Sequence, residues 1–335
     1  MRILAGDIGG TKTILQISDY TDGQFTVRAE QRFESNAFNV FDNLLQDFFL
    51  QHPALSKEIH AACIGVAGPV ENQTAKVTNL PWSLQTDSLS ERFTIPHVYL
   101  INDFQAVGYG IERLSQTDLT CLQAGQNKQR AVRAVIGAGT GLGQATLIWD
   151  DEINSYRVYA SEAGHTSFAP TNEIQIELLK YLSQQYECVS LERVLSGPGI
   201  ENIFNFLCAK QPDLLSAQLA EALPQKDLTP VIVEYAVQNK DPLAAQALDL
   251  FVEVYGAAAG NLALTVLPMG GVYIAGGIAP RITEKLLQGS FLRSFTNKSK
   301  MKTLLEAIPV MVINNAKVGL LGAANYAVKG ELLSG

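Results

Sequence analysis

Residues 3–17 read ILAGDIGGTKTILQI, two apolar runs joined by a turn that is rich in glycine. Residues 3–5 and 13–17 each have the composition of a β-strand, and the glycines between them favour a tight turn. The pattern therefore predicts a strand–turn–strand hairpin and not a strand that leads into a helix. Glycine amides in such a turn can approach a ligand closely because no Cβ shields them.

A second segment repeats this layout. Residues 131–149 read AVRAVIGAGTGLGQATLIW, with β-like runs at 131–136 and 145–149 and a turn at Gly137 to Gly143. Two glycine-turn hairpins in one chain indicate a weak internal repeat, in which the core of one domain is duplicated.

The remaining elements are predicted from apolar periodicity and length. We expect further buried strands at residues 61–66, 97–101, 271–275 and 310–313. We expect helices at residues 38–49 and 317–328, and a mainly helical region at 173–289 that contains an Ala- and Leu-rich helix at 242–267.

Length and charge exclude several classes of protein. The chain has 335 residues, 47% of them hydrophobic, which is enough for a large core and too apolar for a disordered protein. Its 25 Lys and Arg against 33 Asp and Glu give a net charge of −8 without a basic cluster, so nucleic-acid and anionic-membrane partners are not expected.

The cysteines and the apolar segments point to a cytoplasmic protein. The four cysteines lie far apart, which favours reduced thiols over disulfides or a structural zinc site; they are Cys63, Cys121, Cys188 and Cys208. Asp7 and the neighbouring glycines interrupt the first apolar run too early for a signal peptide. No uninterrupted run of eighteen apolar residues is present, so no membrane span is expected.

Phosphate is the obvious ligand for bare glycine amides, but two familiar phosphate motifs do not fit. Lys12 follows Thr11 and not a glycine, so the spacing of a Walker loop fails. A dinucleotide fingerprint would need glycine at Leu142 and a helix after it. The alternative is that the turns are simply tight hairpins, although three glycine clusters at strand ends weigh against it.

The glycine segments carry a resemblance to a known superfamily. Asp7 to Thr11 resembles the first phosphate loop of the sugar kinases, actin and heat-shock ATPases, and residues 137–143 resemble the second. Gly276-Gly277, after an apolar strand, is similar to the segment that lies near the adenosine. Within that superfamily the chain resembles the bacterial-type glucokinases over nearly its whole length.

The resemblance implies an α/β fold with two actin-like (ribonuclease H-like) domains. Each domain would have a mixed sheet flanked by helices, and the active-site cleft would lie between the domains. We expect a small domain of residues 1–109 plus 316–335 and a large domain of residues 110–315. A cysteine-rich zinc segment, as in the related ROK group, does not follow His165.

Asn102-Asp103 stands where an apolar strand meets a helix. Asp103 could cap that helix, or it could accept the proton of a hydroxyl that attacks a phosphate. The resemblance implies the second role, because glucokinases carry an Asn-Asp pair here and use the Asp as the catalytic base. It also implies that Asn102 contacts the sugar.

Glu162-Ala163-Gly164-His165 places two polar side chains three residues apart. Zinc is a rival ligand, but no cysteine or second histidine lies near enough in sequence to complete its ligand set. The segment resembles the Glu-Gly-Gly-His segment of glucokinases, which implies that Glu162 and His165 bind sugar hydroxyls.

Three further positions are assigned to the sugar pocket from the resemblance alone. Glu192 reads most simply as a surface residue paired with an arginine, yet its segment is similar to the one that binds the O1 end of the sugar. Gly68 and Asn79 resemble positions that line the same pocket, and a plain turn explains them almost as well.

The resemblance also implies the reaction, the transfer of the ATP γ-phosphate to the 6-hydroxyl of D-glucose. The phosphates and adenosine would contact the glycine segments, namely Gly9, Gly10, Thr11, Gly139, Thr140, Gly141, Gly276 and Gly277. Mg²⁺ would be held by Asp7 through water, because Mg²⁺ gives up its water reluctantly. A homodimer is expected. The alternatives are a kinase of another hexose or N-acetylated sugar, a non-catalytic actin-like nucleotide switch, and a sugar-sensing regulator.

Overall fold

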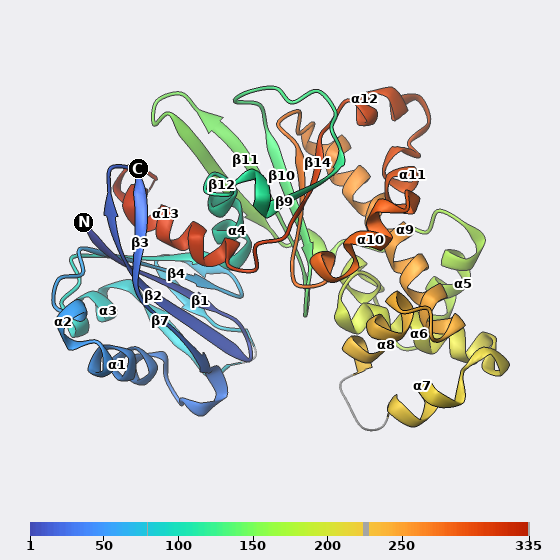
Figure 1. The fold of residues 1–335 in the computed structure, drawn as a ribbon, viewed down its shortest axis with the longest axis horizontal. Helices are drawn as coiled ribbons and strands as arrows, with labels where there is room; N and C mark the ends of the chain where they lie inside the picture. Colours follow the sequence, from blue (N-terminus) through green and yellow to red (C-terminus); the bar gives the residue numbers. More distant parts are fainter. Residues whose placement is uncertain (79, 224–227, 334–335) are drawn as a thin grey trace. The chain divides into compact units, whose positions relative to one another are not determined.

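A computed structural model of the chain describes residues 1–78, 80–223 and 228–333. The chain forms two compact units (Figure 1): the first is Met1–Gln116, Leu147–Ala160 and Asn315–Gly335, and the second is Thr117–Thr146 and Ser161–Asn314. Residues 147–160 thus pack with the first unit, although they lie within the segment expected to form the large domain. The expected domain limits themselves stay a prediction.

The first unit is built on a five-stranded mixed sheet with the order β3-β2-β1-β4-β8. Its strands are β1 (Arg2–Ile8), β2 (Lys12–Thr21), β3 (Gln24–Glu34), β4 (Ala61–Val66) and β8 (His97–Asn102). β1 and β2 form the predicted antiparallel hairpin, while β1, β4 and β8 run parallel to one another. The predicted strands at 61–66 and 97–101 are confirmed. A small sheet of β5 (Val70–Glu71), β6 (Thr74–Lys76) and β7 (Ser83–Gln85) follows β4.

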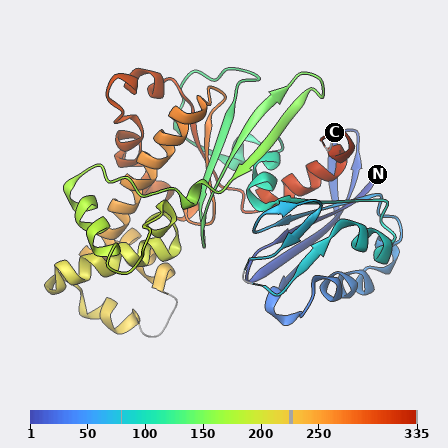
Figure 2. The ribbon, with the colours of Figure 1, turned by 180° about the vertical axis from the view of Figure 1, so that it is seen from behind.

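Helices flank this sheet: α1 (Phe41–Gln51), α2 (Pro53–Ser56), α3 (Thr86–Phe93), α4 (Asp103–Ile111) and α13 (Val318–Leu333). α13 packs against α4, β1 and β4, so the C-terminal helix lies on the sheet formed by the N-terminal strands (Figure 2). Gly322 allows this contact, because a Cβ at its position would overlap the carbonyl oxygen of Ala106 in α4.

The other large sheet has six strands in the order β12-β11-β10-β13-β14-β9, and most of it belongs to the second unit, while the end of β11 and nearly all of β12 fall within residues 147–160 of the first unit. Its strands are β9 (Leu119–Gln123), β10 (Arg133–Ala138), β11 (Leu142–Asp150), β12 (Ser155–Ser161), β13 (Val272–Ala275) and β14 (Val310–Ile313). If β9 is left out, the other five strands repeat the order of the first sheet. In both sheets the third, second, first, fourth and fifth strands in chain order lie side by side. The predicted internal repeat is therefore confirmed at the level of strand order.

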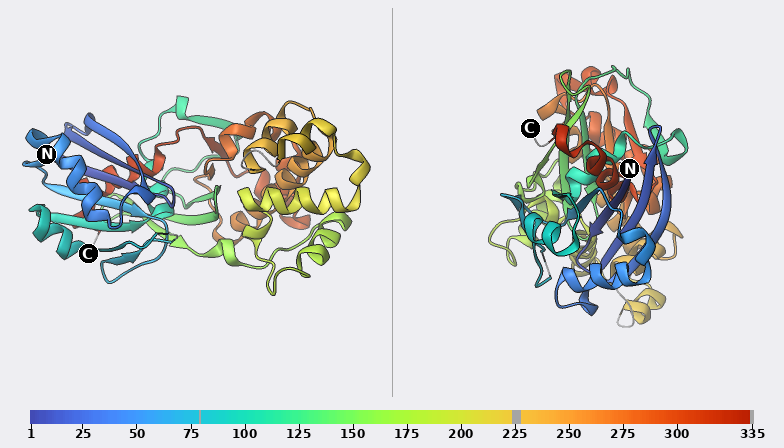
Figure 3. Two further views of the ribbon diagram at one scale, coloured as in Figure 1. Left: turned by 90° about the horizontal axis from the view of Figure 1, so that it is seen from below. Right: turned by 90° about the vertical axis from the view of Figure 1, so that its left-hand side faces the viewer.

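The helices of the second unit gather beside this sheet (Figure 3). They are α5 (Glu173–Leu182), α6 (Gly197–Lys210), α7 (Ala217–Ala222), α8 (Leu228–Val237), α9 (Pro242–Val266), α10 (Thr283–Leu287), α11 (Ser290–Thr296) and α12 (Lys302–Glu306). The 3₁₀ turns of this unit include η3 (Ala163–His165) and η4 (Leu191–Arg193). The expected helical region at 173–289 is thus mainly helical, with β13 inside it.

α9 is the core helix of the second unit. It is long and apolar enough to cross a membrane by length and composition, but 72% of its most apolar window is buried inside the structure. α6, α8 and α11 pack against it, and side chains such as Leu248, Phe251 and Tyr255 are fully buried. Burial of this apolar surface is the main favourable term in the folding of the unit.

Candidate active site

The first glycine turn joins β1 to β2 and is held by a buried serine. The Gly9 N–H donates to the Lys12 carbonyl at 2.9 Å. Ser35 donates its hydroxyl to Gly9 O at 3.1 Å and its N–H to Thr11 O at 2.9 Å, and its hydroxyl lies 3.0 Å from that of Thr13. Within the described part of the chain, no protein acceptor bonds the amides of Gly10 or Thr11. The turn is thus fixed through its carbonyls, while these two amides remain available to an anion.

Asp7 lies near the end of β1, directly before this turn. Its side chain is half-buried, and Gly319 at the start of α13 leaves room beside it, since a Cβ there would lie 3.5 Å from Asp7 Oδ2. No cationic side chain pairs with Asp7 among the described residues. Loss of hydration therefore raises the pKa of the Asp7 carboxyl to about 6.

Asp7→Asn is expected to change how stability depends on pH. The pKa of Asp7 is about 6 in the folded protein and 3.8 in the unfolded chain. Between these two pH values the folded protein keeps a proton that the unfolded chain has lost. The parent protein should lose stability from about pH 4 to pH 6, and the Asn variant should not. At about 1.4 kcal/mol per pKa unit, the variant should be more stable by roughly 2–3 kcal/mol above pH 7 and equal near pH 4.

Urea unfolding at a series of pH values checks this result. The exposed residue Asp213 supplies the control, because Asp213→Asn should follow the parent curve. Parallel curves for Asp7→Asn and the parent at every pH would contradict the expected penalty.

Asn102 and Asp103 have different structural roles at the start of α4. Asn102 is the N-cap, with its Oδ1 accepting the N–H groups of Phe104 at 2.9 Å and Gln105 at 3.2 Å. Its Nδ2 donates to the Gly68 carbonyl at 3.1 Å. Asp103 is the first residue of the helix, and its Oδ1 accepts the Phe104 N–H at 2.9 Å. The capping role that the sequence allowed for Asp103 thus belongs to Asn102, which also ties the segment after β4 to α4.

The parallel strands of the first sheet bring these residues to one edge. Ile8, Val66 and Asn102 lie in register across β1, β4 and β8, so all three strands end at the same edge. Neighbouring strands are about 4.8 Å apart, which places the ends of β1 and β8 roughly 10 Å from each other. This edge gathers the predicted residues Asp7, Gly9, Gly10, Thr11, Gly68, Asn102 and Asp103. Asn79 lies outside the described residues.

The second glycine turn joins β10 to β11 and is held by contacts from two later segments. The Gly139 N–H donates to Gly141 O at 2.8 Å, and the N–H of Gly197, at the start of α6, donates to Gly139 O at 2.8 Å. Thr140, at the tip of this turn, is exposed.

Glu192 lies directly against this turn. Its Oε2 accepts the Leu142 N–H at 2.8 Å, and a Cβ at Gly141 would lie only 2.6 Å from that oxygen. Glu192 is half-buried in η4, and this amide is its partner among the described residues. The arginine pairing considered for Glu192 is therefore not what the structure shows; Arg193 instead stacks on the Tyr186 ring, 4.2 Å from its centroid.

Glu162 and His165 lie at the two ends of the η3 turn. Both side chains are exposed, whereas Gly164 between them is buried and packs so closely on Leu142 that a Cβ would overlap the Leu142 carbonyl oxygen. The His165 N–H donates to Glu162 O at 3.0 Å, which closes the turn. Since Leu142 also binds Glu192, the second unit holds Glu162, His165 and Glu192 around one strand end.

Gly276 and Gly277 follow β13, which runs parallel to β10. Gly276 has a φ of +83°, and a Cβ there would overlap the Ala138 carbonyl oxygen. Gly277 is exposed and has open space around it. The glycine segments after β10 and β13 thus lie at one edge of the second sheet, as the corresponding segments do in the first.

Tyr255 of α9 holds these two strand ends and was not predicted from the sequence. Its buried hydroxyl accepts the Ala138 N–H at 3.3 Å and lies 3.2 Å from Ile136 O and 3.3 Å from Ala275 O, one of which receives its proton. Burial raises the pKa of this hydroxyl, so it stays protonated. The only sequence signal is a tyrosine within an Ala- and Gly-rich helix; Ser35 gave none.

Tyr255→Phe is expected to lower the free energy of unfolding by about 1–3 kcal/mol, because it leaves buried backbone groups without a partner. Urea unfolding measures the change. Tyr273→Phe is the control, since no bond to the Tyr273 hydroxyl is present among the described residues. Equal stability of the two variants would contradict the bridging role of Tyr255.

Comparison with known proteins agrees with this arrangement. A protein-family model described as Glucokinase matches residues 4–330. The chain is 46% identical to a glucokinase of Nostoc punctiforme over 98% of this chain and 99% of that protein.

Two solved structures give the same result at the level of the fold. A glucokinase from an Antarctic psychrotroph superposes with a TM-score of 0.83 at 30% identity, covering 98% of this chain and 99% of that one. A ROK family glucokinase from Streptomyces griseus, solved in complex with glucose and AMPPNP, has a TM-score of 0.65 at 22% identity, with coverage of 98% and 100%. These structures confirm the predicted actin-like α/β fold, and the match of the family model over nearly the whole chain shows that this protein belongs to the glucokinase family.

Proposed function

We propose that Asp103 is the general base in the reaction of this family, the ATP-dependent phosphorylation of D-glucose at its 6-hydroxyl. As a family member the chain is a hexose kinase, and the products are glucose 6-phosphate and ADP. The observation that carries the proposal is the position of Asp103. It begins α4 at the sheet edge that also bears Asp7 and the first glycine turn.

The position of Asp103 is what allows it to act as the base. Asn102 caps α4 and is anchored to Gly68, so the peptide that carries Asp103 is held from two sides. The Asp103 carboxylate accepts the proton of the 6-hydroxyl as that oxygen attacks the γ-phosphorus. Phosphoryl transfer asks little more of the protein than placement of the nucleophile and stabilisation of charge.

The sugar contacts are assigned to polar side chains. Asn102 retains one amide hydrogen after its bond to Gly68, and Gly68 lies beside it. Glu162 and His165 are exposed, and Glu192 keeps its Oε1 after Oε2 binds Leu142. Asn79 is assigned to the same pocket. Carboxylates, an amide and an imidazole can satisfy several hydroxyls at once, which rejects analogues that lack one of them.

The phosphates are bound by backbone amides. In the first turn (Gly9, Gly10 and Thr11), the amides of Gly10 and Thr11 serve, because the Gly9 N–H already bonds Lys12 O. In the second turn (Gly139, Thr140 and Gly141), the amides of Thr140 and Gly141 serve, because the Gly139 N–H already bonds Gly141 O. Gly276 and Gly277 contact the adenosine side. A relative of the same fold was solved with AMPPNP and glucose, which supports ATP as the donor.

Mg²⁺ fits Asp7, whose carboxylate lacks a cationic partner among the described residues. No group of three described His, Cys, Asp or Glu side chains is arranged to hold a metal ion, so Asp7 would bind Mg²⁺ through water. When bound, Mg²⁺ neutralises charge on the phosphates.

A coupled assay with ATP and a panel of glucose, mannose, fructose and N-acetylglucosamine tests the proposal. Glucose should give the highest kcat/KM. Preference for another sugar would assign the chain to that hexose or N-acetylated sugar, and ATP hydrolysis without sugar stimulation would indicate a nucleotide switch.

We also propose a cytoplasmic homodimer without nucleic-acid or membrane partners. The acidic net charge weighs against nucleic-acid partners, and the burial of α9 weighs against a membrane partner. The homodimer is proposed from the resemblance to similar proteins. Light scattering coupled to size-exclusion chromatography should give twice the chain mass of 36.3 kDa, and a monomer mass would contradict the proposal.

A further inference from the structure

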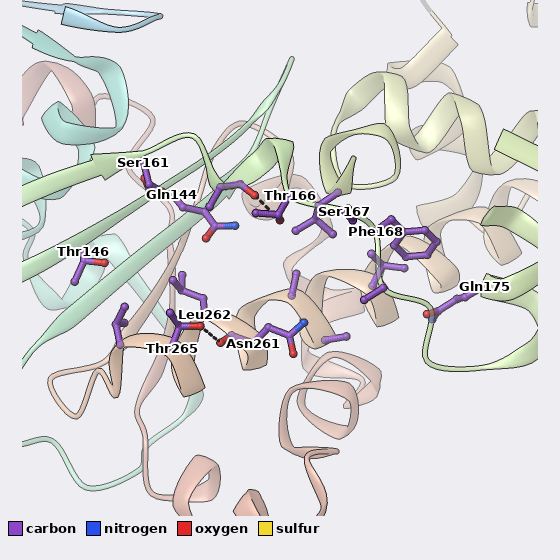
Figure 4. Close-up of a pocket in the computed structure, with 17 residues that line it drawn as sticks. Gln144, Thr146, Ser161, Thr166, Ser167, Phe168, Gln175, Asn261, Leu262 and Thr265 are labelled. Atoms are coloured by element: carbon purple, nitrogen blue, oxygen red, sulfur yellow. Dashed lines mark hydrogen bonds between the residues drawn. The ribbon is translucent and has the colours of Figure 1, made fainter. Parts of the chain in front are cut away.

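A cavity of about 370 Å³, open to solvent, lies in the second unit between β11, residues 161–169 and α9 (Figure 4). Within the described part of the chain, its walls include none of Glu162, His165 and Glu192. It is therefore distinct from the candidate sugar contacts, and its volume falls in the range of small-molecule sites.

The polar groups of the cavity are uncharged. They come from β11, the 161–169 segment, α5 and α9, and include Gln144, Thr146, Thr166, Gln175, Asn261 and Thr265. No Lys, Arg, Asp, Glu or His is part of the described wall, so the site does not suit a phosphate or a cation. The rest of the wall is apolar, with Phe168 and Leu191 among its side chains.

Two buried carboxamides belong to the cavity wall, and one of them faces the cavity. Gln175 is 1% exposed, and its Oε1 accepts the N–H of Thr171 at 2.8 Å and its hydroxyl at 3.0 Å. This fixes the amide, and its Nε2 is shielded from the cavity and lacks an acceptor among the described residues, so Gln175 shapes the wall and does not offer a ligand a donor. Gln144 is 6% exposed, and its amide points from β11 into the cavity (Figure 4). A largely buried amide that faces a cavity favours a ligand or water that can bond it, so it is Gln144 that favours a polar ligand.

The cavity wall continues directly into the candidate sugar site. Ala163 and Thr166 line the cavity on either side of His165, and the Thr166 hydroxyl donates to Ala163 O at 2.8 Å. The Leu191 N–H donates to Thr166 O at 2.7 Å, and Leu191 lines the cavity next to Glu192. A ligand in the cavity would therefore contact the neighbours of all three candidate sugar contacts in this unit.

We propose that this cavity binds a second, uncharged hexose molecule and that its occupation changes the affinity of the catalytic sugar site. A pyranose offers hydroxyls that both donate and accept, together with C–H faces that pack on apolar side chains, and the wall matches both features. The coupling acts through η3 and η4, which carry cavity residues and sugar contacts alike. It rests on the proposed function, because it takes Glu162, His165 and Glu192 as those contacts.

Equilibrium dialysis of the full chain with labelled D-glucose, into the millimolar range, tests the proposal. The parent protein should bind two molecules per chain. Ala257→Leu fills the cavity from α9 and should bind one, with an altered KM for glucose. Ala245→Leu, on the same helix but outside the cavity, should bind two and keep the parent KM.

A second, more conservative variant keeps the test decisive if Ala257→Leu does not fold. Thr146→Val keeps the shape and removes one hydroxyl, and it should weaken the second site by up to about tenfold, the effect of one hydrogen bond. Saturation of the parent at one glucose per chain with normal turnover would overturn the second site. Two unweakened sites in both cavity variants would overturn it as well. Absence of sugar phosphorylation by the parent would instead refute the proposed function.

Discussion

Replacing Asp103 with asparagine is expected to lower kcat for glucose phosphorylation by about 10²–10⁴-fold, the usual contribution of a general base. The asparagine Oδ1 can still accept the Phe104 N–H that the Asp103 carboxylate accepts at 2.9 Å, so the start of α4 should keep its geometry. What is lost is the ability to take up the proton of the 6-hydroxyl. The dissociation constant for ATP should stay near that of the parent, because the nucleotide is assigned to the glycine turns.

The coupled assay gives kcat, and isothermal titration with a non-hydrolysable ATP analogue gives nucleotide affinity. Asp87→Asn is the matched control, since Asp87 is an exposed aspartate in the first turn of α3 and contributes the same charge to a helix N-terminus. Asp103→Asn with a kcat close to that of the control would remove Asp103 from the role of base.

Local sequence patterns predicted the parts of the fold that depend on neighbouring residues. The hairpin around Gly9 and Gly10 was readable because a glycine turn between two apolar runs has few other solutions. The strand at residues 61–66 is fully buried on both faces, as its continuous apolar run indicated. The second hairpin at Gly137 to Gly143 indicated a weak internal repeat, and the strand order of the two sheets agrees with it.

The contacts that shape the site could not be predicted in this way, because they join residues far apart in the chain. Ser35 holds the first turn from 26 residues beyond Gly9, and Tyr255 reaches Ala138 across 117 residues. Glu192 looked like a surface partner of an arginine, whereas the fold brings it to the Leu142 amide. Even between neighbours the outcome depended on backbone angles, which gave the helix cap to Asn102 and left the first helical position to Asp103.

Gly276→Ala is expected to lower the free energy of unfolding by about 2–5 kcal/mol, the combined cost of left-handed backbone strain and of forced repacking. The φ of +83° disfavours any residue with a Cβ, and the Ala138 carbonyl occupies the space that the new methyl group needs. β10 and β13 would have to separate at the place where Tyr255 bridges them. Because both glycine segments follow these strand ends, the KM for ATP should also rise several-fold.

The adjacent residue supplies the control for stability. Gly277 has no positive φ and nothing within 4 Å of an added Cβ, so Gly277→Ala should unfold at nearly the same urea concentration as the parent. Both substitutions reduce the conformational freedom of the unfolded chain to the same extent. A difference in stability between the two variants therefore reports the need for glycine at position 276 in the folded state. If Gly276→Ala were as stable as Gly277→Ala, the strand ends would be more adaptable than their hydrogen bonds through Tyr255 imply. In that case the second sheet edge would not be the rigid support that the proposed binding of the nucleotide phosphates requires.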